Sequence, residues 1–108
     1  MGSASVSFGP FELRQDNLSL LREGRPIAIG QHAYKLMQAL VAGDGETVSK
    51  TALLEAGWPG TLVEEGNLTV QIAALRKALG PRPDRQEWIV TVPRAGYRLR
   101  WRCCRSRI

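Results

Sequence analysis

The chain has 108 residues, of which 44% are hydrophobic and 23% are charged, a balance typical of one globular domain that needs no disulfide bonds. No uninterrupted apolar run approaches the length of a bilayer span, and no signal-peptide pattern opens the sequence, which argues against a membrane protein. The two cysteines, Cys103 and Cys104, are adjacent and lack zinc-ligand spacing. Neighbouring cysteines rarely pair with each other, so they favour a reducing compartment, and we expect a cytoplasmic protein.

The net charge of +5 is unevenly distributed along the chain. Residues 1–54 hold five basic and five acidic side chains, whereas residues 55–108 hold ten basic and five acidic ones. Nearly all of this excess is arginine, which favours bidentate contacts to phosphate or carboxylate groups. Such asymmetry is expected for a protein with a polyanionic partner, although a solvated basic face without a partner is the alternative.

The N-terminal block, residues 7–29, is predicted to form short strands over residues 8–13, 18–21 and 26–29. Turn-forming residues separate these runs at positions 15–17 and 23–24. Pro10 lies inside the first run and predicts an edge or bulged strand there. We find no chemical motif in this block and interpret it as a structural platform.

Two helices are predicted next. Residues 31–42 carry apolar side chains on one face, with Gly30 as a weak N-cap and Gly-Asp-Gly at 43–45 as a stop signal. Ser49 is a stronger cap for a second helix over residues 50 to about 56. The Gly-Trp-Pro-Gly sequence at 57–60 ends that helix.

The third predicted helix lies within residues 63–80. Leu68, Ile72, Leu75 and Leu79 recur at helical spacing and form one apolar stripe. The start is open between residues 62 and 67, because a capping box of Thr61 with Glu64 and a later start at Gly66-Asn67 both fit. The opposite face holds small side chains, amides and a single charge, which is unusual for a solvated helix and suits close approach to base edges in a major groove. A helix packed on both sides is the alternative. The residues of this opposite face are Gly66, Asn67, Val70, Ala73, Ala74 and Lys77, with Gln71 on its flank.

A β-hairpin is predicted at the end of the chain, with strands at 88–92 and 97–101 joined by Pro-Arg-Ala-Gly at 93–96. Tyr97 and Leu99 face one side of the second strand, whereas Arg98 and Arg100 face the other. Arginines along one face and at the tip suit contacts to phosphates or to a minor groove. An amphipathic edge hairpin whose arginines prevent aggregation is the alternative.

These segments together resemble the OmpR/PhoB-type winged-helix DNA-binding domain over roughly residues 7–101, with residues 1–6 and 102–108 as flexible ends. The resemblance implies an α+β fold: a winged helix-turn-helix with an N-terminal antiparallel β-sheet, three helices and a C-terminal β-hairpin wing. Several separated motifs occur in the order found in the family. They are Val-Ser-Lys at 48–50, Gly-Trp-Pro at 57–59, Val-Glu-Glu at 63–65, Asn-Leu at 67–68, Ile-Ala-Ala-Leu-Arg-Lys-Ala-Leu-Gly at 72–80, Ile-Val-Thr-Val at 89–92 and Gly-Tyr-Arg-Leu at 96–99.

The resemblance also implies roles for individual positions. It places major-groove contacts at Gly66, Asn67, Val70, Gln71 and Ala74. It implies backbone contacts from Arg76 and Lys77 on the helix and from Thr91, Arg94 and Tyr97 in the wing, to which Arg98 is added by its place in the hairpin. It also implies that the loop after the second helix touches RNA polymerase in family activators, through Trp58, Pro59, Gly60, Thr61 and Leu62.

This chain departs from the family pattern at several of these positions. Relatives carry basic or histidine side chains where it has Gly66, Gln71 and Ala74, so we expect different base readout. Pro93 replaces a wing arginine or glycine-rich turn, and Arg94 supplies a substitute charge. Family members usually add a phosphorylatable receiver, as in a two-component phosphorelay, or a membrane segment leading to a sensor. Neither is found in this sequence, so we expect an excised output domain or a one-component regulator.

The sequence does not favour an enzyme. His32 is the single histidine and has no partner at metal or triad spacing. No phosphate-binding loop or dinucleotide fingerprint occurs, and Glu64 and Glu65 are adjacent on a helix and do not face each other. We therefore expect no catalytic residues, no cofactor and no metal site. The predicted partner is double-stranded DNA, bound sequence-specifically by a domain that is monomeric in solution and pairs in tandem on DNA. The alternative is a winged-helix module used mainly for protein–protein contact.

Overall fold

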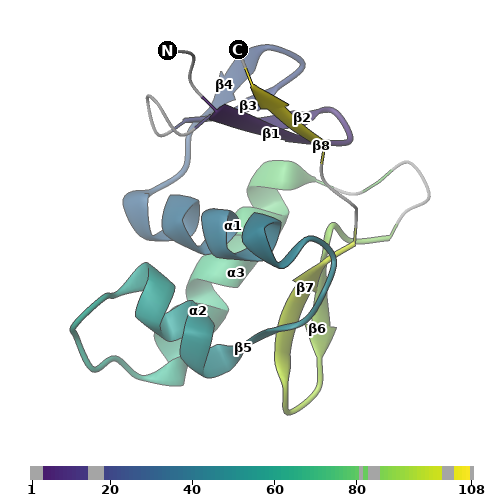
Figure 1. Cartoon of the computed structure of the whole chain (residues 1–108). Helices are drawn as coiled ribbons and strands as arrows, with labels where there is room; N and C mark the ends of the chain where they lie inside the picture. Colours follow the sequence, from purple (N-terminus) through teal and green to yellow (C-terminus); the bar gives the residue numbers. More distant parts are fainter. Residues whose placement is uncertain (1–3, 15–18, 81, 83–85, 101–103, 108) are drawn as a thin grey trace.

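A computed structural model describes residues 4–14, 19–80, 82, 86–100 and 104–107 of the chain. These residues form three helices and eight strands. An N-terminal sheet lies at one end of the molecule, the helices lie next to it, and a β-hairpin stands beside the third helix (Figure 1). This arrangement confirms the predicted α+β winged helix-turn-helix. None of the helices in these ranges is long and apolar enough to cross a membrane.

The N-terminal sheet has five antiparallel strands in the order β4-β3-β2-β1-β8. Its core-facing side chains include Val6, Phe8, Phe11, Leu13 and Leu20, all at most 2% exposed. Pairing of alternate apolar side chains on one face is what allows such short strands to hold together. The strands are β1 (Ala4–Phe8), β2 (Phe11–Arg14), β3 (Ser19–Arg22), β4 (Arg25–Ile27) and β8 (Cys104–Arg107).

The single strand predicted over residues 8–13 is wrong, because the chain turns sharply at Gly9 and Pro10. Phe8 and Phe11 become register partners of β1 and β2, with ring centroids 5.2 Å apart. Gly9 has a φ of +57°, and a Cβ there would lie 2.3 Å from the Trp88 ring. Only glycine fits both constraints without displacing a buried indole. Pro10, which lacks a donor, is tolerated because it lies in the turn.

Strand structure extends beyond the predicted boundaries of 7–101, because β1 begins at Ala4 and β8 covers Cys104–Arg107. β8 pairs antiparallel with β1, with Ala4 opposite Arg107 and Ser7 opposite Cys104. Residues 104–107 read Cys-Arg-Ser-Arg and show no alternation of apolar and polar side chains. Backbone hydrogen bonds to β1 define this strand, and they leave no sequence signal. Trp101, Arg102 and Cys103 lie outside the described residues, as do positions 15–17 of a predicted turn.

The first two helices agree closely with their predicted bounds. They are α1 (Gln31–Gly43) and α2 (Lys50–Gly57). Ser49 caps α2 as predicted, because its side-chain oxygen accepts the backbone N–H of Ala52 at 3.0 Å. Gly30 precedes α1 without a side-chain cap bond, and α1 ends in left-handed backbone at Asp44. The prediction of a stop at 43–45 therefore holds, with aspartate in the left-handed position that glycine often takes.

The third helix, α3 (Glu65–Leu79), begins inside the predicted window of residues 62–67, between its two candidate start signals. Glu64 is the N-cap residue and makes no side-chain cap bond, so the predicted capping box of Thr61 with Glu64 is wrong. The C-terminal end of α3 is bonded to the N-terminal sheet, because Arg22 Nη1 donates to the Leu79 carbonyl oxygen at 3.3 Å. An arginine at a helix C-terminus satisfies a free carbonyl and opposes the negative end of the helix dipole.

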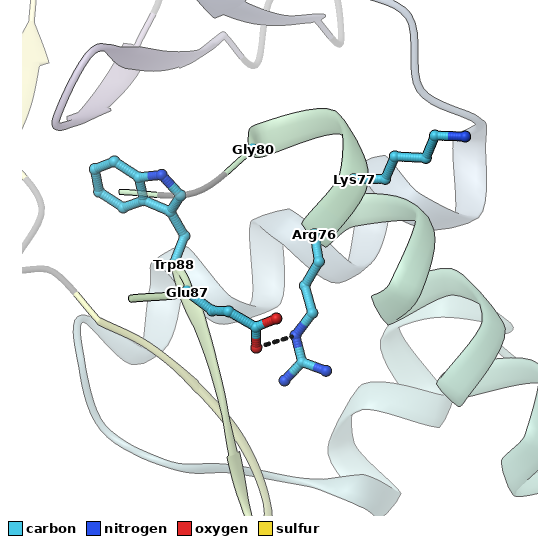
Figure 2. A pocket seen from close by; sticks show the side chains of 5 residues that line it. All are labelled: Arg76, Lys77, Gly80, Glu87 and Trp88. Atoms are coloured by element: carbon cyan, nitrogen blue, oxygen red, sulfur yellow. Dashed lines mark ion pairs between the residues drawn. The ribbon is translucent and has the colours of Figure 1, made fainter. Parts of the chain in front are cut away.

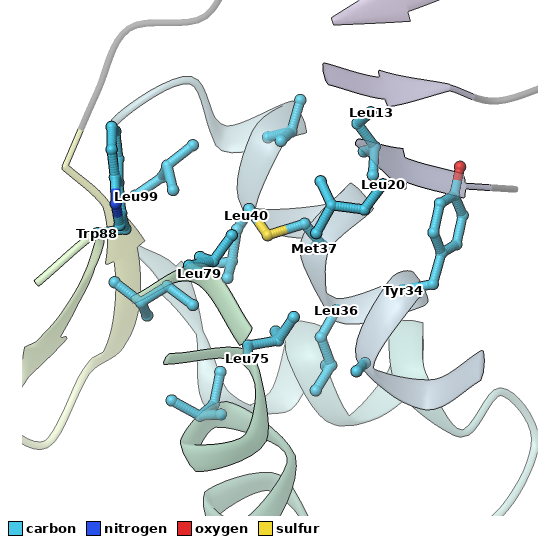
Figure 3. Packing of buried hydrophobic residues seen from close by; sticks show 14 of the residues in the cluster. Leu13, Leu20, Tyr34, Leu36, Met37, Leu40, Leu75, Leu79, Trp88 and Leu99 are labelled. Carbon is cyan, nitrogen blue, oxygen red and sulfur yellow. The ribbon is translucent and has the colours of Figure 1, made fainter. Parts of the chain in front are cut away.

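The predicted apolar stripe of α3 is buried in full: Leu68, Ile72, Leu75 and Leu79 are each at most 1% exposed. They pack with α1 and with the hairpin in one continuous core (Figure 3). Trp88 joins the hairpin to the N-terminal sheet through edge-on contacts with the rings of Phe8 and Phe11 at 6.0 and 5.2 Å. The remaining buried members on α1 and α2 are Ala33, Tyr34, Leu36, Met37, Leu40, Val41 and Leu53.

Leu75→Ala tests this burial directly. We expect it to lower the free energy of unfolding by ~2–5 kcal/mol, because it leaves a cavity in the middle of the core. Val70→Ala on the same helix is the matched control, since Val70 is 64% exposed. We expect Val70→Ala to change the free energy of unfolding by no more than ~0.5 kcal/mol. Equal melting of the two variants in denaturant titrations would show that the inner face of α3 is assigned incorrectly.

Candidate nucleic-acid interface

The outward face of α3 is open to solvent as predicted. Gly66, Asn67, Val70, Ala73, Ala74 and Lys77 are exposed, and Gln71 is half-buried at the flank. A Cβ at Gly66 would meet nothing within 4 Å, so close approach of a partner is unhindered there. The Asn67 amide nitrogen donates to the Glu64 carbonyl oxygen at 3.3 Å. This bond orients the amide at the start of the face and uses one of its two N–H groups.

The start of α3 is tied to α2 by an ion pair. Lys50 Nζ lies 3.2 Å from Glu65 Oε2, and both side chains are partly exposed. Lys50 also donates its backbone N–H to the Ala95 carbonyl oxygen at 3.2 Å, so one residue contacts both α3 and the hairpin turn. No sequence pattern predicts this role of Lys50, because its partners lie 15 and 45 positions away in the chain.

The wing, defined as β6 (Ile89–Val92), β7 (Gly96–Leu99) and the turn at 93–95, follows the predicted hairpin closely. The wing belongs to a three-stranded sheet whose third strand is β5 (Val48–Ser49), which pairs with β7. Gly96 lies so close to β5 that a Cβ would come within 2.0 Å of the Val48 carbonyl oxygen. Pairing with β5 and the Lys50–Ala95 bond therefore set the position of the tip relative to α2.

Arg94 is exposed at this tip and has a φ of +65°. The turn closes through the Ala95 N–H, which donates to the Val92 carbonyl oxygen at 3.0 Å. Left-handed backbone is costly for a non-glycine residue, and it persists where surrounding contacts define the turn. The substitute charge predicted at Arg94 thus lies at the far end of the wing.

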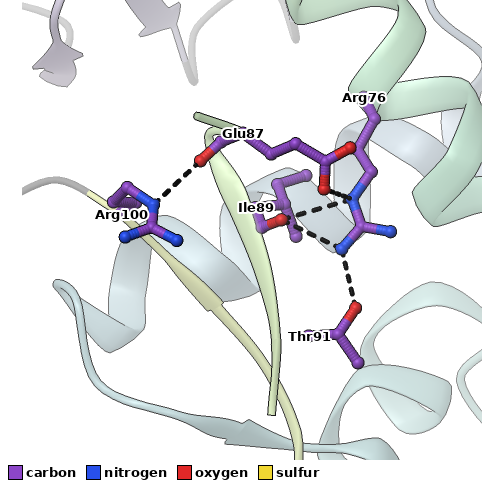
Figure 4. A network of polar contacts seen from close by, with 5 residues as sticks. All are labelled: Arg76, Glu87, Ile89, Thr91 and Arg100. Atoms are coloured by element: carbon purple, nitrogen blue, oxygen red, sulfur yellow. Dashed lines mark hydrogen bonds and ion pairs between the residues drawn. The ribbon is translucent and has the colours of Figure 1, made fainter. Parts of the chain in front are cut away.

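The Arg76 side chain is hydrogen-bonded to neighbouring groups of the same chain (Figure 4). Its Nε and Nη2 donate to the Ile89 carbonyl oxygen at 3.2 and 3.0 Å, and Nη2 also donates to the Thr91 hydroxyl at 2.7 Å. Glu87 Oε2 lies 3.2 Å from Arg76 Nε. Arg76 therefore joins α3 to β6. Its neighbour Lys77 is exposed and points away from Glu87 (Figure 2), so the predicted Arg-Lys pair divides into a bridging residue and an outward one.

The predicted wing contacts do not share one surface. Thr91 and Tyr97 are register partners, which places them on the same side of the hairpin as Arg76. Tyr97 is only 8% exposed, and the Arg76 guanidinium lies 5.9 Å from its ring centroid. Tyr97 is thus part of the core. Arg98 is half-buried on the opposite side, where it lines a hollow together with Asp44, Glu46, Arg82 and Arg100.

The loop between α2 and α3 presents a large apolar side chain to solvent. Leu62 is fully exposed, and Pro59, Gly60 and Thr61 are exposed beside it. Trp58 is half-buried and stacks on the His32 ring, with centroids 4.9 Å apart. His32 Nδ1 lies 2.8 Å from the Gly57 carbonyl oxygen, so this histidine holds the end of α2.

The geometry as a whole defines a winged helix-turn-helix domain, with one helix exposed on its outer face beside a β-hairpin. A family model described as "Transcriptional regulatory protein, C terminal" matches residues 24–99. The chain is 36% identical over 92 residues to the transcriptional regulator HilA of Salmonella typhimurium, covering 85% of this chain and 16% of HilA. It is 30% identical over 98 residues to the phosphate regulon transcriptional regulatory protein PhoB of Rhizobium meliloti, covering 90% of this chain and 43% of PhoB.

Solved structures give the same result. The DNA-binding domain of Escherichia coli CadC superposes with a TM-score of 0.81 at 25% identity, covering 96% of this chain and 98% of that one. The Klebsiella pneumoniae RstA DNA-binding domain, in complex with the RstA box, superposes with a TM-score of 0.74 at 24% identity, a likeness of fold. It covers 88% of this chain and 95% of that one. The chain belongs to the OmpR/PhoB-type family of transcriptional regulatory protein C-terminal domains. It spans less than half the length of HilA and PhoB.

Proposed function

We propose that this domain binds double-stranded DNA sequence-specifically as the output domain of a transcriptional regulator, and that it is not an enzyme. The exposed outer face of α3, with amides and small side chains where an ordinary surface helix carries lysine and glutamate, is the observation that carries the proposal. HilA and PhoB are named as transcriptional regulators, which supports the assignment. A DNA partner also favours a cytoplasmic location, which stays a prediction.

In this proposal α3 enters the major groove with its outer face toward the bases. Asn67 and Gln71 present amides that can pair with adenine, and Val70 presents methyl groups that can contact the methyl group of thymine. Gly66 and Ala74 leave room for the helix to approach the base edges closely. The apolar stripe on the other side of α3 fixes this orientation, because turning the helix would expose four buried side chains.

Backbone contacts are assigned to the wing and to the end of α3. Arg94 at the wing tip and Lys77 on α3 are exposed cations that can meet phosphates without rearrangement. Arg76 already donates a hydrogen bond to the Thr91 hydroxyl, so a phosphate would contact two side chains that are hydrogen-bonded to each other. Tyr97 supports the wing from within, and Arg98 faces the side away from Thr91, where it could meet only a different part of the DNA backbone.

The assembly on DNA and the contact with polymerase are further parts of the proposal. We infer that the domain is monomeric in solution and pairs head to tail on direct repeats. The loop of Trp58, Pro59, Gly60, Thr61 and Leu62 is proposed to touch RNA polymerase, which the full exposure of Leu62 supports. A module used mainly for protein–protein contact is the competing function, and it has no specific observation in its favour beyond this loop.

Salt dependence of duplex binding separates the two functions. Each phosphate contact should contribute about −0.9 to the slope of log K against log salt, because neutralised phosphates release counterions. We therefore expect a steep negative slope for a random-sequence duplex in anisotropy titrations. A slope indistinguishable from zero would contradict DNA binding and favour the protein-contact module.

Substitutions should separate base reading from backbone contact. We expect Gln71→Ala and Asn67→Ala to lower affinity for a preferred site by ~1–3 kcal/mol while leaving random-sequence binding nearly unchanged. Arg94→Ala should weaken binding to the preferred site and to random sequence to a similar extent. It should also make the slope of log K against log salt less steep by about the contribution of one phosphate contact. Alanine retains the Cβ of Arg94, so the left-handed turn is strained equally in both proteins.

The measurement is a pair of titrations, with a preferred and a random duplex, for each variant at two salt concentrations. The Leu75→Ala change is excluded from this series because its effect on folding would obscure binding. If Gln71→Ala and Arg94→Ala behaved alike in all four titrations, the division of labour between α3 and the wing would be incorrect.

A further inference from the structure

Glu87 places a carboxylate against the guanidinium that joins α3 to the wing. Its Oε2 lies 3.2 Å from Arg76 Nε, at the edge of a hollow that Lys77, Gly80 and Trp88 also line (Figure 2). The acid precedes the first residue of β6 by two positions. Residues 55–108 hold ten basic side chains and five acidic ones, and Glu87 pairs with one of these basic side chains, that of Arg76.

The contacts of Arg76 differ in how firmly they are made. The Ile89 carbonyl oxygen accepts two N–H groups of Arg76, and the Thr91 hydroxyl accepts a short bond of 2.7 Å. Glu87 approaches as an ion pair, with its side chain 62% exposed and that of Arg76 27% exposed. Exposed ion pairs contribute little to stability and are easily exchanged for another partner. The carboxylate is therefore the replaceable partner of the three.

The backbone of Glu87 is held independently of its side chain. Its carbonyl oxygen accepts a hydrogen bond from Arg100 Nε at 3.2 Å, which ties the segment before β6 to the residue that follows β7 (Figure 4). The carboxylate can therefore swing away through its own torsions while the wing keeps its position. Arg76 would keep its bonds to Ile89 and Thr91, so loss of the ion pair leaves the bridge between α3 and the wing in place.

We propose that Glu87 competes with DNA phosphates for Arg76 and thereby weakens binding to duplexes of any sequence. Carboxylate and phosphate oxygens are both anionic acceptors for a guanidinium, so the two partners satisfy the same donor. A phosphate that reaches Arg76 must displace Glu87 and also meets its negative charge. The consequence is that base contacts from the outer face of α3 supply a larger share of the binding free energy. This inference rests on the proposed DNA-binding function.

Glu87→Gln tests the competition, because it keeps the shape of the side chain and removes its charge. We expect the variant to bind a random-sequence duplex roughly two- to fivefold more tightly at low salt, the range that an exposed ion pair allows. The gain should shrink as salt rises, since both the pair and the phosphate contact are screened. The melting temperature should stay unchanged.

Two further proteins make the result specific to Arg76. Glu23→Gln removes the same charge at the turn between β3 and β4, in the N-terminal sheet, and should give a clearly smaller gain. In an Arg76→Gln background, Glu87→Gln should likewise give a clearly smaller gain in affinity, because the cation for which Glu87 and phosphate compete is absent. If that background does not fold, the comparison with Glu23→Gln and the salt dependence decide the question.

Three results would overturn the proposal: unchanged or weaker binding by Glu87→Gln, an equal gain from Glu23→Gln, or an equal gain without Arg76. Weaker binding together with a lower melting temperature would show that Glu87 is a structural brace. Failure of the unmodified domain to bind the duplex in a salt-dependent manner would instead remove the proposed DNA-binding function. That outcome appears in the parent protein and is thus distinct from a failure of the competition.

Discussion

Four aliphatic side chains on one side of α3 anchor the helix in the core and thereby determine which residues face outward. Leu68, Ile72, Leu75 and Leu79 are fully buried, so the helix cannot turn about its axis without exposing them. The amides and small residues of the opposite face are exposed as a consequence. Because most of the stability of a short helix comes from such packing, the orientation of the outer face and the stability of the domain depend on the same contacts.

The wing is positioned by polar contacts rather than by burial alone. Arg76 bonds the end of α3 to Ile89 and Thr91, and Lys50 joins the start of α2 to the turn at Ala95. The exposed cations Arg94 and Lys77 are therefore held at defined places relative to the outer face of α3. Exposed cations bind any polyanion, and in our proposal the carboxylate of Glu87 beside Arg76 counteracts that tendency.

The features that follow from local pattern were predictable from the sequence, and those that depend on distant partners were not. The buried stripe of α3, its open outer face and the Ser49 cap arise from helical periodicity and capping chemistry, and all three are confirmed. The hairpin at Gly9 was missed because its glycine is required by Trp88, far along the chain. β8 was missed because pairing with β1, and no alternation of its own side chains, defines it. In the site, the exposure of Arg94 followed from its place in a turn. The engagement of Arg76 by Glu87 and Thr91 did not, because no spacing rule connects Arg76 to a strand that begins 13 positions later in the chain.

Base reading by the outer face of α3 in the major groove can be measured by selecting bound sequences from a random duplex pool and then mapping the contacts by guanine N7 methylation interference. The N7 atom lies in the major groove, so methylation there blocks a helix that reads this groove. We expect a defined enriched sequence and interference at guanines within it. Enrichment of no sequence, or binding unaffected by methylation at every guanine of the selected site, would contradict it.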